Sequence, residues 1–272
     1  MQQKNIIYKD ATIFYKVTGT GKKVILIHGF GEDGSMWQQQ VNFLKDRFCI
    51  ILPDIPGSGN SSFLKNANID IYADIVKEIL DKEVQELPFE NNNEVCIIGH
   101  SMGGYIALAF AEKFPQYLNS FGLFHSSAFA DEPIKQEGRL KAIEFIKTHG
   151  AYAFLRTVVP NLFTKNFSEK HPEQLDALLV KGENFTKETL IQYYQAMIAR
   201  PDRTAVLKNF NKPVLFIIGE HDLAIPLNTS MQQCYLPAQA DINILGHSAH
   251  MGMWEEKEKA NEIILEFLVN NI

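Results

Sequence analysis

VCIIGHSMGGYIALAFAEKF, residues 95–114, holds a short apolar run, a turn, and a longer stretch rich in alanine and glycine. The run Val95–Ile98 has the composition of a buried strand, and the residues after the turn have that of a slim helix packed on a sheet. The turn itself, GHSMG at Gly99–Gly103, matches the pattern G-x-S-x-G. Such an abrupt turn pushes its central side chain out above the sheet, beside the free N–H groups of a helix N-terminus. We therefore expect Ser101 to be a nucleophile.

Apolar runs on both sides of this stretch alternate with segments of helical periodicity. After an opening hairpin over Ile6–Tyr8 and Thr12–Val17, the predicted strands are Val24–Ile27, Phe48–Leu52, Val95–Ile98, Leu118–Phe124, Val214–Ile218 and Ala240–Leu245. The predicted helices between and after them begin near Ser35 and cover Asp70–Leu87 and about Glu255–Val269. This alternation predicts an α/β fold with a mostly parallel sheet flanked by helices.

The alternation stops between residues 126 and 209, where only helical patterns occur. Four helices are expected there, over Ile134–Thr148, Tyr152–Val159, Glu173–Lys181 and Lys187–Ala199. We predict a core made of residues 1–125 and 210–272, with residues 126–209 forming an α-helical cap. Open α/β sheets bind ligands at the carboxyl ends of their strands, so the cap should cover that edge.

Two later strand ends carry the groups that a serine nucleophile needs. Asp222 follows the strand that ends at residue 218, and His250 follows the one that ends at residue 245. A serine hydroxyl needs a base, which is normally a histidine held in one tautomer by a carboxylate. The tetrahedral intermediate also needs two N–H donors, one of which is expected from the backbone of Met102.

The order of these residues resembles the α/β-hydrolase family, in the branch with a serine nucleophile and a helical cap. The resemblance implies a catalytic triad of Ser101, Asp222 and His250. Glu220 and His247 are the neighbouring alternatives; the strand-end position of Glu220 suits a supporting role, and the sequence after His250 fits the family better.

Two further segments resemble family signatures. His28-Gly29-Phe30 is similar to the H-G-x motif, which implies that the backbone N–H of Phe30 is the second oxyanion donor. Residues 54–61 are similar to D-x-P-G-x-G-x-S, where we expect Asp54 to organise loop N–H groups rather than to act in catalysis.

The expected substrate-binding residues are few. They are His28, Gly29, Tyr193, Met197 and Met251. Arg200 and Arg203 end the last cap helix, and ion pairs that hold the cap to the core are favoured over binding of a substrate carboxylate.

The resemblance implies a serine hydrolase of small acyl compounds, with a carboxylesterase favoured. A carbon–carbon bond hydrolase or related lyase with the same triad is one alternative, because such enzymes often carry a cap arginine. A non-catalytic ligand-binding protein on this fold is the other. No metal or cofactor is implied.

Composition limits the partners. The net charge of −6 over 272 residues argues against nucleic acid and anionic membranes, and leaves a small-molecule substrate. Three sparse cysteines and an N-terminus without an apolar signal region predict reduced thiols and a cytoplasmic location. The sequence leaves the oligomeric state open.

Overall fold

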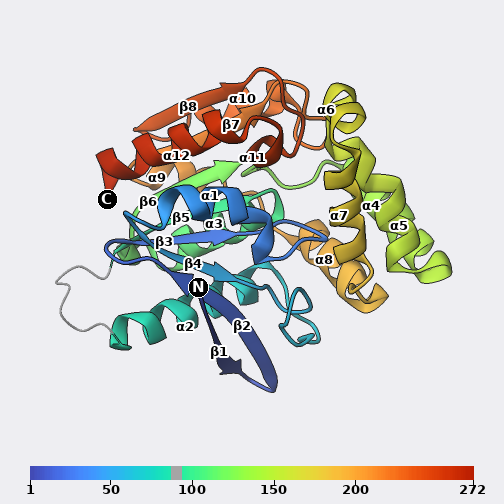
Figure 1. Cartoon of the computed structure of the whole chain (residues 1–272), viewed down its shortest axis with the longest axis horizontal. Helices are drawn as coiled ribbons and strands as arrows, with labels where there is room; N and C mark the ends of the chain where they lie inside the picture. Colours follow the sequence, from blue (N-terminus) through green and yellow to red (C-terminus); the bar gives the residue numbers. More distant parts are fainter. Residues whose placement is uncertain (87–93) are drawn as a thin grey trace.

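The computed structural model describes residues 1–86 and 94–272, and an eight-stranded sheet forms its centre (Figure 1). The strand order is β1-β2-β4-β3-β5-β6-β7-β8, antiparallel between β1, β2 and β4 and parallel from there on. The strands are β1 Gln2–Tyr8, β2 Ala11–Thr18, β3 Lys23–Ile27, β4 Cys49–Pro53, β5 Val95–His100, β6 Leu118–Phe124, β7 Val214–Gly219 and β8 Ala240–Leu245. The predicted α/β fold is confirmed.

The central strands are buried throughout. Every residue of β3, β4, β5 and β7 has a buried side chain, which explains why each appears in the sequence as a continuous apolar run. The outer strand β8 alternates exposed and partly buried residues. The strand that leads to Ser101, β5, is therefore one of the fully buried central strands.

Helices cover both faces of the sheet (Figure 1). The helix α2, Ile69–Glu86, packs against α3, Met102–Lys113, and α3 contacts α9, Thr204–Asn209. On the other face, α1, Gln38–Leu44, packs against α12, Lys257–Asn271. The predicted end of the second helix, Leu87, lies outside the described residues.

The predicted helix near Ser35 has two parts. A 3-10 turn, η1 (Gly34–Trp37), precedes α1 because the Asp33 side chain accepts a hydrogen bond from the N–H of Ser35 and starts the turn there. A second short 3-10 turn, η2, covers Pro115–Tyr117 before β6.

The cap lies over the carboxyl ends of the parallel strands, at the right of Figure 1. Its helices are α4 Pro133–His149, α5 Ala151–Val158, η3 Val159–Leu162, α6 Lys165–Lys170, α7 Pro172–Gly182 and α8 Lys187–Ala199. Three short helices were not predicted: α6 and α9, together with α10, Leu227–Cys234. Each has only six to eight residues, which is too short for a helical pattern to stand out.

The single C-terminal helix predicted over Glu255–Val269 is wrong in one respect. The structure has a short helix α11, Gly252–Glu255, and a break at Glu256 before α12 begins. The two glutamates at the break bind loop amides, since Glu255 accepts from the N–H of Ala249 and Glu256 from that of His247.

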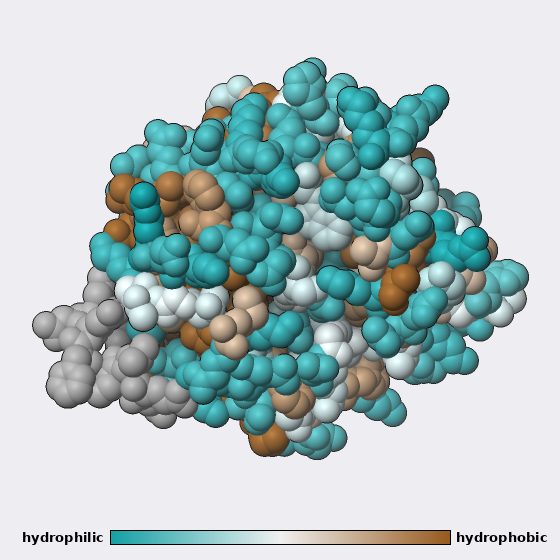
Figure 2. All heavy atoms as spheres, in the orientation of Figure 1, coloured by the Kyte–Doolittle hydropathy of each residue, from teal (hydrophilic) through white to brown (hydrophobic). Residues whose placement is uncertain are grey.

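The face shown in Figure 2 is largely hydrophilic, and its hydrophobic side chains form small separate groups. Within the described residues, no helix combines the length and apolar character needed to cross a membrane.

Candidate active site

Ser101 lies at the turn between β5 and α3 in a conformation that few residues adopt. Its φ is +51° and its ψ is −115°, and its N–H donates to the carbonyl oxygen of Phe124 at 2.9 Å. Gly103 makes the turn possible, because a Cβ at that position would lie only 2.4 Å from the carbonyl oxygen of Ile27. At Gly99 a Cβ would lie 2.1 Å from the carbonyl oxygen of Gly103. Both glycines of the motif are thus required by backbone contacts.

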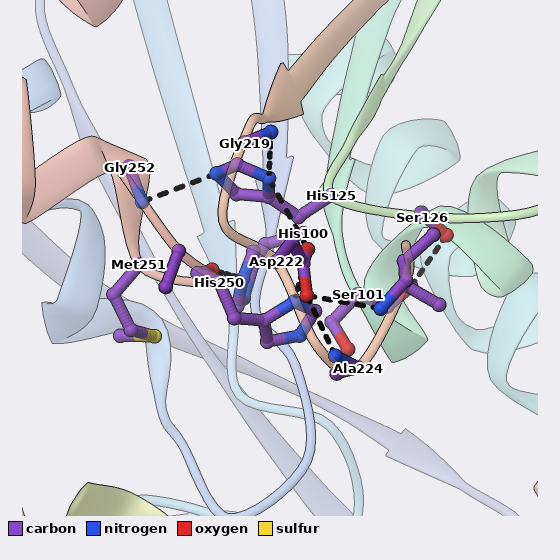
Figure 3. A network of polar contacts seen from close by, with 12 residues as sticks. His100, Ser101, His125, Ser126, Gly219, Asp222, Ala224, His250, Met251 and Gly252 are labelled. Atoms are coloured by element: carbon purple, nitrogen blue, oxygen red, sulfur yellow. Dashed lines mark hydrogen bonds and ion pairs between the residues drawn. The ribbon is translucent and has the colours of Figure 1, made fainter. Parts of the chain in front are cut away.

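Asp222 and His250 meet at the ends of β7 and β8, as the sequence predicts. The Nδ1 of His250 lies 2.7 Å from Oδ2 of Asp222, and both residues are buried (Figure 3). The other carboxylate oxygen, Oδ1, accepts from the N–H groups of Ala224 and Ile225 at 2.8 and 2.9 Å. Burial alone would raise the pKa of Asp222, but His250 and the N–H of Ile225 lower it to about 2. Asp222 is therefore ionised at neutral pH.

His250 is positioned with its second ring nitrogen free for another partner. Both His250 and Ser101 line one cavity, and in Figure 3 the side chain of Ser101 points toward the imidazole. The N–H of His250 donates to the carbonyl oxygen of Leu162 in the cap, at 2.9 Å. The competing candidates Glu220 and His247 are exposed and do not line this cavity.

His125, which was not among the sequence candidates, lies on the other side of Asp222. Its Nδ1 is 3.5 Å from Oδ2 of Asp222, and the N–H groups of Gly219 and Gly252 point at its two ring nitrogens. Burial lowers the pKa of His125 well below its usual value, Asp222 opposes this, and the neighbouring His250 adds to it. A neutral imidazole accepts from one of these two N–H groups through its single acceptor nitrogen, whereas an imidazolium could accept from neither. The only sequence signal for His125 was its position directly after the predicted strand Leu118–Phe124.

Two backbone N–H groups at the site are free of hydrogen-bond acceptors in the described chain. They belong to Phe30 and Met102, the predicted oxyanion donors. The loop of Phe30 is held by Glu32, whose Oε2 accepts from the N–H of Gly29 at 2.6 Å. The ring of Phe30 stacks on Tyr194 of the cap at 4.4 Å between centroids.

The cavity has a volume of about 960 Å³ and is lined by residues of both the core and the cap. Its apolar wall is built by cap residues. They include Leu155, Val158, Val159, Leu162, Leu178 and Met197. Phe30 and Ile225 come from core loops. An acyl chain of moderate length fits these dimensions and this lining.

A charged cluster occupies another part of the cavity wall. Asp131, with a side chain that is 0% exposed, accepts from Arg200 at 2.9 Å and from Arg139 at 2.6 Å. The guanidinium of Arg200 also donates to two carbonyl oxygens and lies over the ring of Tyr105 at 3.9 Å. Two arginines around one carboxylate leave one positive charge in excess. Arg139 was not a sequence candidate, because its role depends on how α4 docks.

Arg203 binds elsewhere. It pairs with Asp70 on α2 and Glu112 on α3, and therefore fixes the chain to the core as it leaves the cap. Arg203 therefore joins the cap to the core by ion pairs, as expected, whereas Arg200 pairs with Asp131, which itself lies in the cap segment 126–209.

The structure revises the predicted set of substrate-binding residues. Met197 lines the cavity, whereas His28, Gly29, Tyr193 and Met251 do not. The ring of His28 is occupied by the N–H of Ile55 and the hydroxyl of Ser58. The hydroxyl of Tyr193 donates to the carbonyl oxygens of residues 55 and 56. Met251 is fully buried, and Gly29 faces Glu32 and His100.

Asp54 has the predicted supporting role in the loop that follows β4. Its carboxylate accepts from the N–H groups of Gly34 and Asn60. Within residues 1–86 and 94–272, no three His, Cys, Asp or Glu side chains are arranged to hold a metal ion.

Comparison with known proteins places this geometry among hydrolases. Residues 22–257 match the family model described as alpha/beta hydrolase fold. A 2-hydroxy-6-oxononadienedioate/2-hydroxy-6-oxononatrienedioate hydrolase of Paraburkholderia phymatum is 28% identical, over 95% of this chain and 91% of its own. A pimeloyl-[acyl-carrier protein] methyl ester esterase of Vibrio atlanticus is 25% identical, over 80% and 83%. A thermophilic esterase from Thermogutta terrifontis has a similar structure, with a TM-score of 0.90, 26% identity and 99% of each chain covered.

Proposed function

The chain belongs to the α/β-hydrolase fold family, and on that premise we propose that it is a serine hydrolase that cleaves esters of small acyl groups. The observation that carries the proposal is the meeting of Ser101 and the Asp222–His250 pair in one cavity. In the proposed reaction, Nε2 of His250 takes the Ser101 proton as Oγ attacks the ester carbonyl. His250 then gives that proton to the departing alkoxide, which leaves an acyl-enzyme.

The remaining parts of the site fit the same reaction. The carbonyl oxygen becomes an oxyanion, and the N–H groups of Phe30 and Met102 are the proposed donors. Water then attacks the acyl-enzyme, with His250 again as base, and releases the acid and Ser101. Asp222 keeps the His250 proton on Nδ1 throughout, so that Nε2 can accept.

Turnover of short p-nitrophenyl esters tests this proposal. We expect the wild-type protein to release p-nitrophenolate and Ser101→Ala to reduce kcat by at least about 10⁴-fold. Acid-quenched wild-type protein should carry the acyl mass on the peptide of Ser101. The control is Ser62→Ala, because Ser62 is exposed on a loop outside the cavity. Equal turnover by wild type and Ser101→Ala would refute the mechanism.

A second candidate is hydrolysis of a carbon–carbon bond beside a ketone, the activity named for the relative from Paraburkholderia phymatum. The observation that favours it is the positive excess of Arg139 and Arg200 around Asp131, because a dienedioate carries two carboxylates. Turnover of a 2-hydroxy-6-oxo-dienedioate with poor turnover of simple esters would select this candidate. Efficient ester turnover without cleavage of that compound would exclude it.

A further inference from the structure

We propose that Glu32 and His100 form a buried, proton-sharing pair that positions both the oxyanion loop and the backbone of His250 around Ser101. The proposal rests on the function proposed above, since it assigns the pair to the same site. Neither residue was singled out in the sequence. Both act through other groups, so they are positioning residues.

One imidazole joins three segments of the active site. The Oε2 of Glu32 accepts from the N–H of Gly29 at 2.6 Å and lies 3.1 Å from Nδ1 of His100. The Nε2 of His100 lies 2.9 Å from the carbonyl oxygen of His250. His100 directly precedes Ser101 in the chain. The loop after β3, the nucleophile and the base are thus tied together within two hydrogen bonds of each other.

The chemistry of these contacts fixes the number of protons. A carbonyl oxygen only accepts, so Nε2 of His100 must carry a proton. With its only ring proton on Nε2, a neutral His100 would turn the lone pair of Nδ1 toward the lone pairs of Oε2 at 3.1 Å, so a second proton must lie between Oε2 and Nδ1. Whichever atom holds it, the pair contains one proton more than a neutral imidazole beside a carboxylate. Removing that proton leaves two lone pairs facing each other in a buried site.

Burial makes this arrangement depend on both partners. His100 is 0% exposed and Glu32 is 4% exposed. Burial alone would lower the pKa of His100, but Glu32 and the carbonyl of His250 raise it. Burial alone would raise the pKa of Glu32, but His100 and the N–H of Gly29 lower it. The pair is therefore intact between a lowered pKa for Glu32 and a raised pKa for His100.

Other titratable groups face the pair from the neighbouring elements. The rings of His250 and His125 lie 4.9 and 6.1 Å from the ring of His100, between centroids. Asp222 favours the charged form of His100, and His28 favours the ionised form of Glu32. Two aromatic rings, Trp37 and Phe124, also lie edge-on to the imidazole of His100.

The backbone carbonyl and the backbone N–H of His250 are both hydrogen-bonded. Its carbonyl accepts from His100 in the core, and its N–H donates to Leu162 in the cap. Without the His100 contact, the carbonyl of His250 loses its own hydrogen bond to the core, while the imidazole keeps its hydrogen bond to Asp222. Misplacement by about 1 Å of a reacting group can cost 10²-fold in rate, so this contact bears on kcat.

Histidine NMR on the wild-type protein tests the proton count without any substrate. We expect the two ring nitrogens of His100 to show an imidazolium or strongly hydrogen-bonded form at pH 7, with loss of that signal only at alkaline pH. The Gly29 amide should exchange slowly with solvent. A His100 whose Nδ1 is neither protonated nor strongly hydrogen-bonded through the range pH 6–9 would refute the proposal, and this result does not depend on whether the protein cleaves esters.

Two variants test the positioning role, Glu32→Gln and His100→Gln. An amide has no charge to balance an imidazolium, so Glu32→Gln should lower the pKa of His100 and speed exchange of the Gly29 amide. On p-nitrophenyl esters we expect kcat to fall about 10–100-fold with KM changed less than about threefold. The alkaline fall of kcat should begin at lower pH in Glu32→Gln than in wild type.

Matched controls are Glu220→Gln and His247→Gln, which change exposed residues of the same types that follow β7 and β8. Both should keep wild-type kcat and the wild-type pH profile. If Glu32→Gln remains folded with unchanged kcat, pH profile and Gly29 exchange, the pair has no positioning role. Failure of the wild type to cleave any ester would count against the proposed function, and the NMR and exchange results would still decide the pair.

Discussion

Replacing Asp222 with asparagine should retain the shape of the active site and invert the tautomer of His250. The two carboxylate oxygens have different partners: Oδ1 accepts from two loop amides, of Ala224 and Ile225, and Oδ2 from Nδ1 of His250. The asparagine oxygen must take the place of Oδ1, because its NH₂ group there would face two N–H donors. The NH₂ group then occupies the place of Oδ2 and donates to Nδ1 of His250.

That exchange moves the ring proton of His250 to Nε2. A protonated Nε2 cannot accept the proton of Ser101, so the base is lost although every heavy atom keeps its place. The expected fall in kcat is about 10⁴-fold, the size found when the same exchange forces the wrong tautomer in a Ser-His-Asp triad. In free energy this is about 5.5 kcal/mol of transition-state stabilisation.

The assay is kcat/KM on a p-nitrophenyl ester, with thermal unfolding and nitrogen NMR of His250 measured on the same sample. Because the pKa of Asp222 is lowered to about 2, its carboxylate stays charged from about pH 4 upward. The defect of Asp222→Asn should therefore persist across that range, because protonation of the wild-type carboxylate does not contribute there. The control Glu220→Gln changes the exposed carboxylate two residues earlier and should keep activity within about twofold. More than a tenth of wild-type activity in folded Asp222→Asn, or an equal loss in Glu220→Gln, would refute the acid assignment.

Three further changes test the fold, the cavity and the thiols. Gly103→Ala should lower the free energy of unfolding in urea by about 2–3 kcal/mol, since its Cβ would lie 2.4 Å from the carbonyl oxygen of Ile27. The control Gly138→Ala adds a Cβ that meets nothing within 4 Å inside a helix, and it should stabilise the protein by up to about 1 kcal/mol. Equal effects of the two substitutions would refute the close-contact argument. Arg139→Gln should raise KM about tenfold for half-esters of dicarboxylic acids but not for neutral esters. Arg156→Gln changes an exposed arginine outside the cavity and is the control. A uniform effect of Arg139→Gln on both ester classes would contradict a carboxylate site. Ellman's reagent at pH 8 should label no cysteine in the native protein and three in urea, because all three are buried. Burial also raises the pKa of the Cys96 thiol to about 12 and that of Cys234 to about 11. Rapid labelling of the native protein would show an accessible thiol.

The local sequence determined the elements that depend on neighbours along the chain. The strands Leu118–Phe124 and Ala240–Leu245 were predicted to the residue, although the first is almost entirely buried and the second alternates exposed and partly buried residues. The helix Lys187–Ala199 was likewise predicted to its ends. The position of Ser101 followed from sterics, because only glycines tolerate the close backbone contacts on either side of it.

The hydrogen-bond and ion-pair partners of polar side chains could not be predicted from local sequence patterns. Glu32 and His100 are 68 residues apart, and His125 and Asp222 are 97 residues apart, so no periodicity relates them. The same holds for His28 and Tyr193, which were expected to contact substrate and instead bind the loop after β4.

The GHSMG turn thus fixed where a nucleophile would stand, and the tertiary structure decided what surrounds it. Hydrophobic patterning reports which face of an element is buried, and that is a property of a few consecutive residues. Other properties are set only when distant strands and the cap pack together. These are the direction of a hydrogen bond, the protonation of a buried histidine and the net charge of the cavity wall. For this protein, those contacts are the ones that will define its substrate.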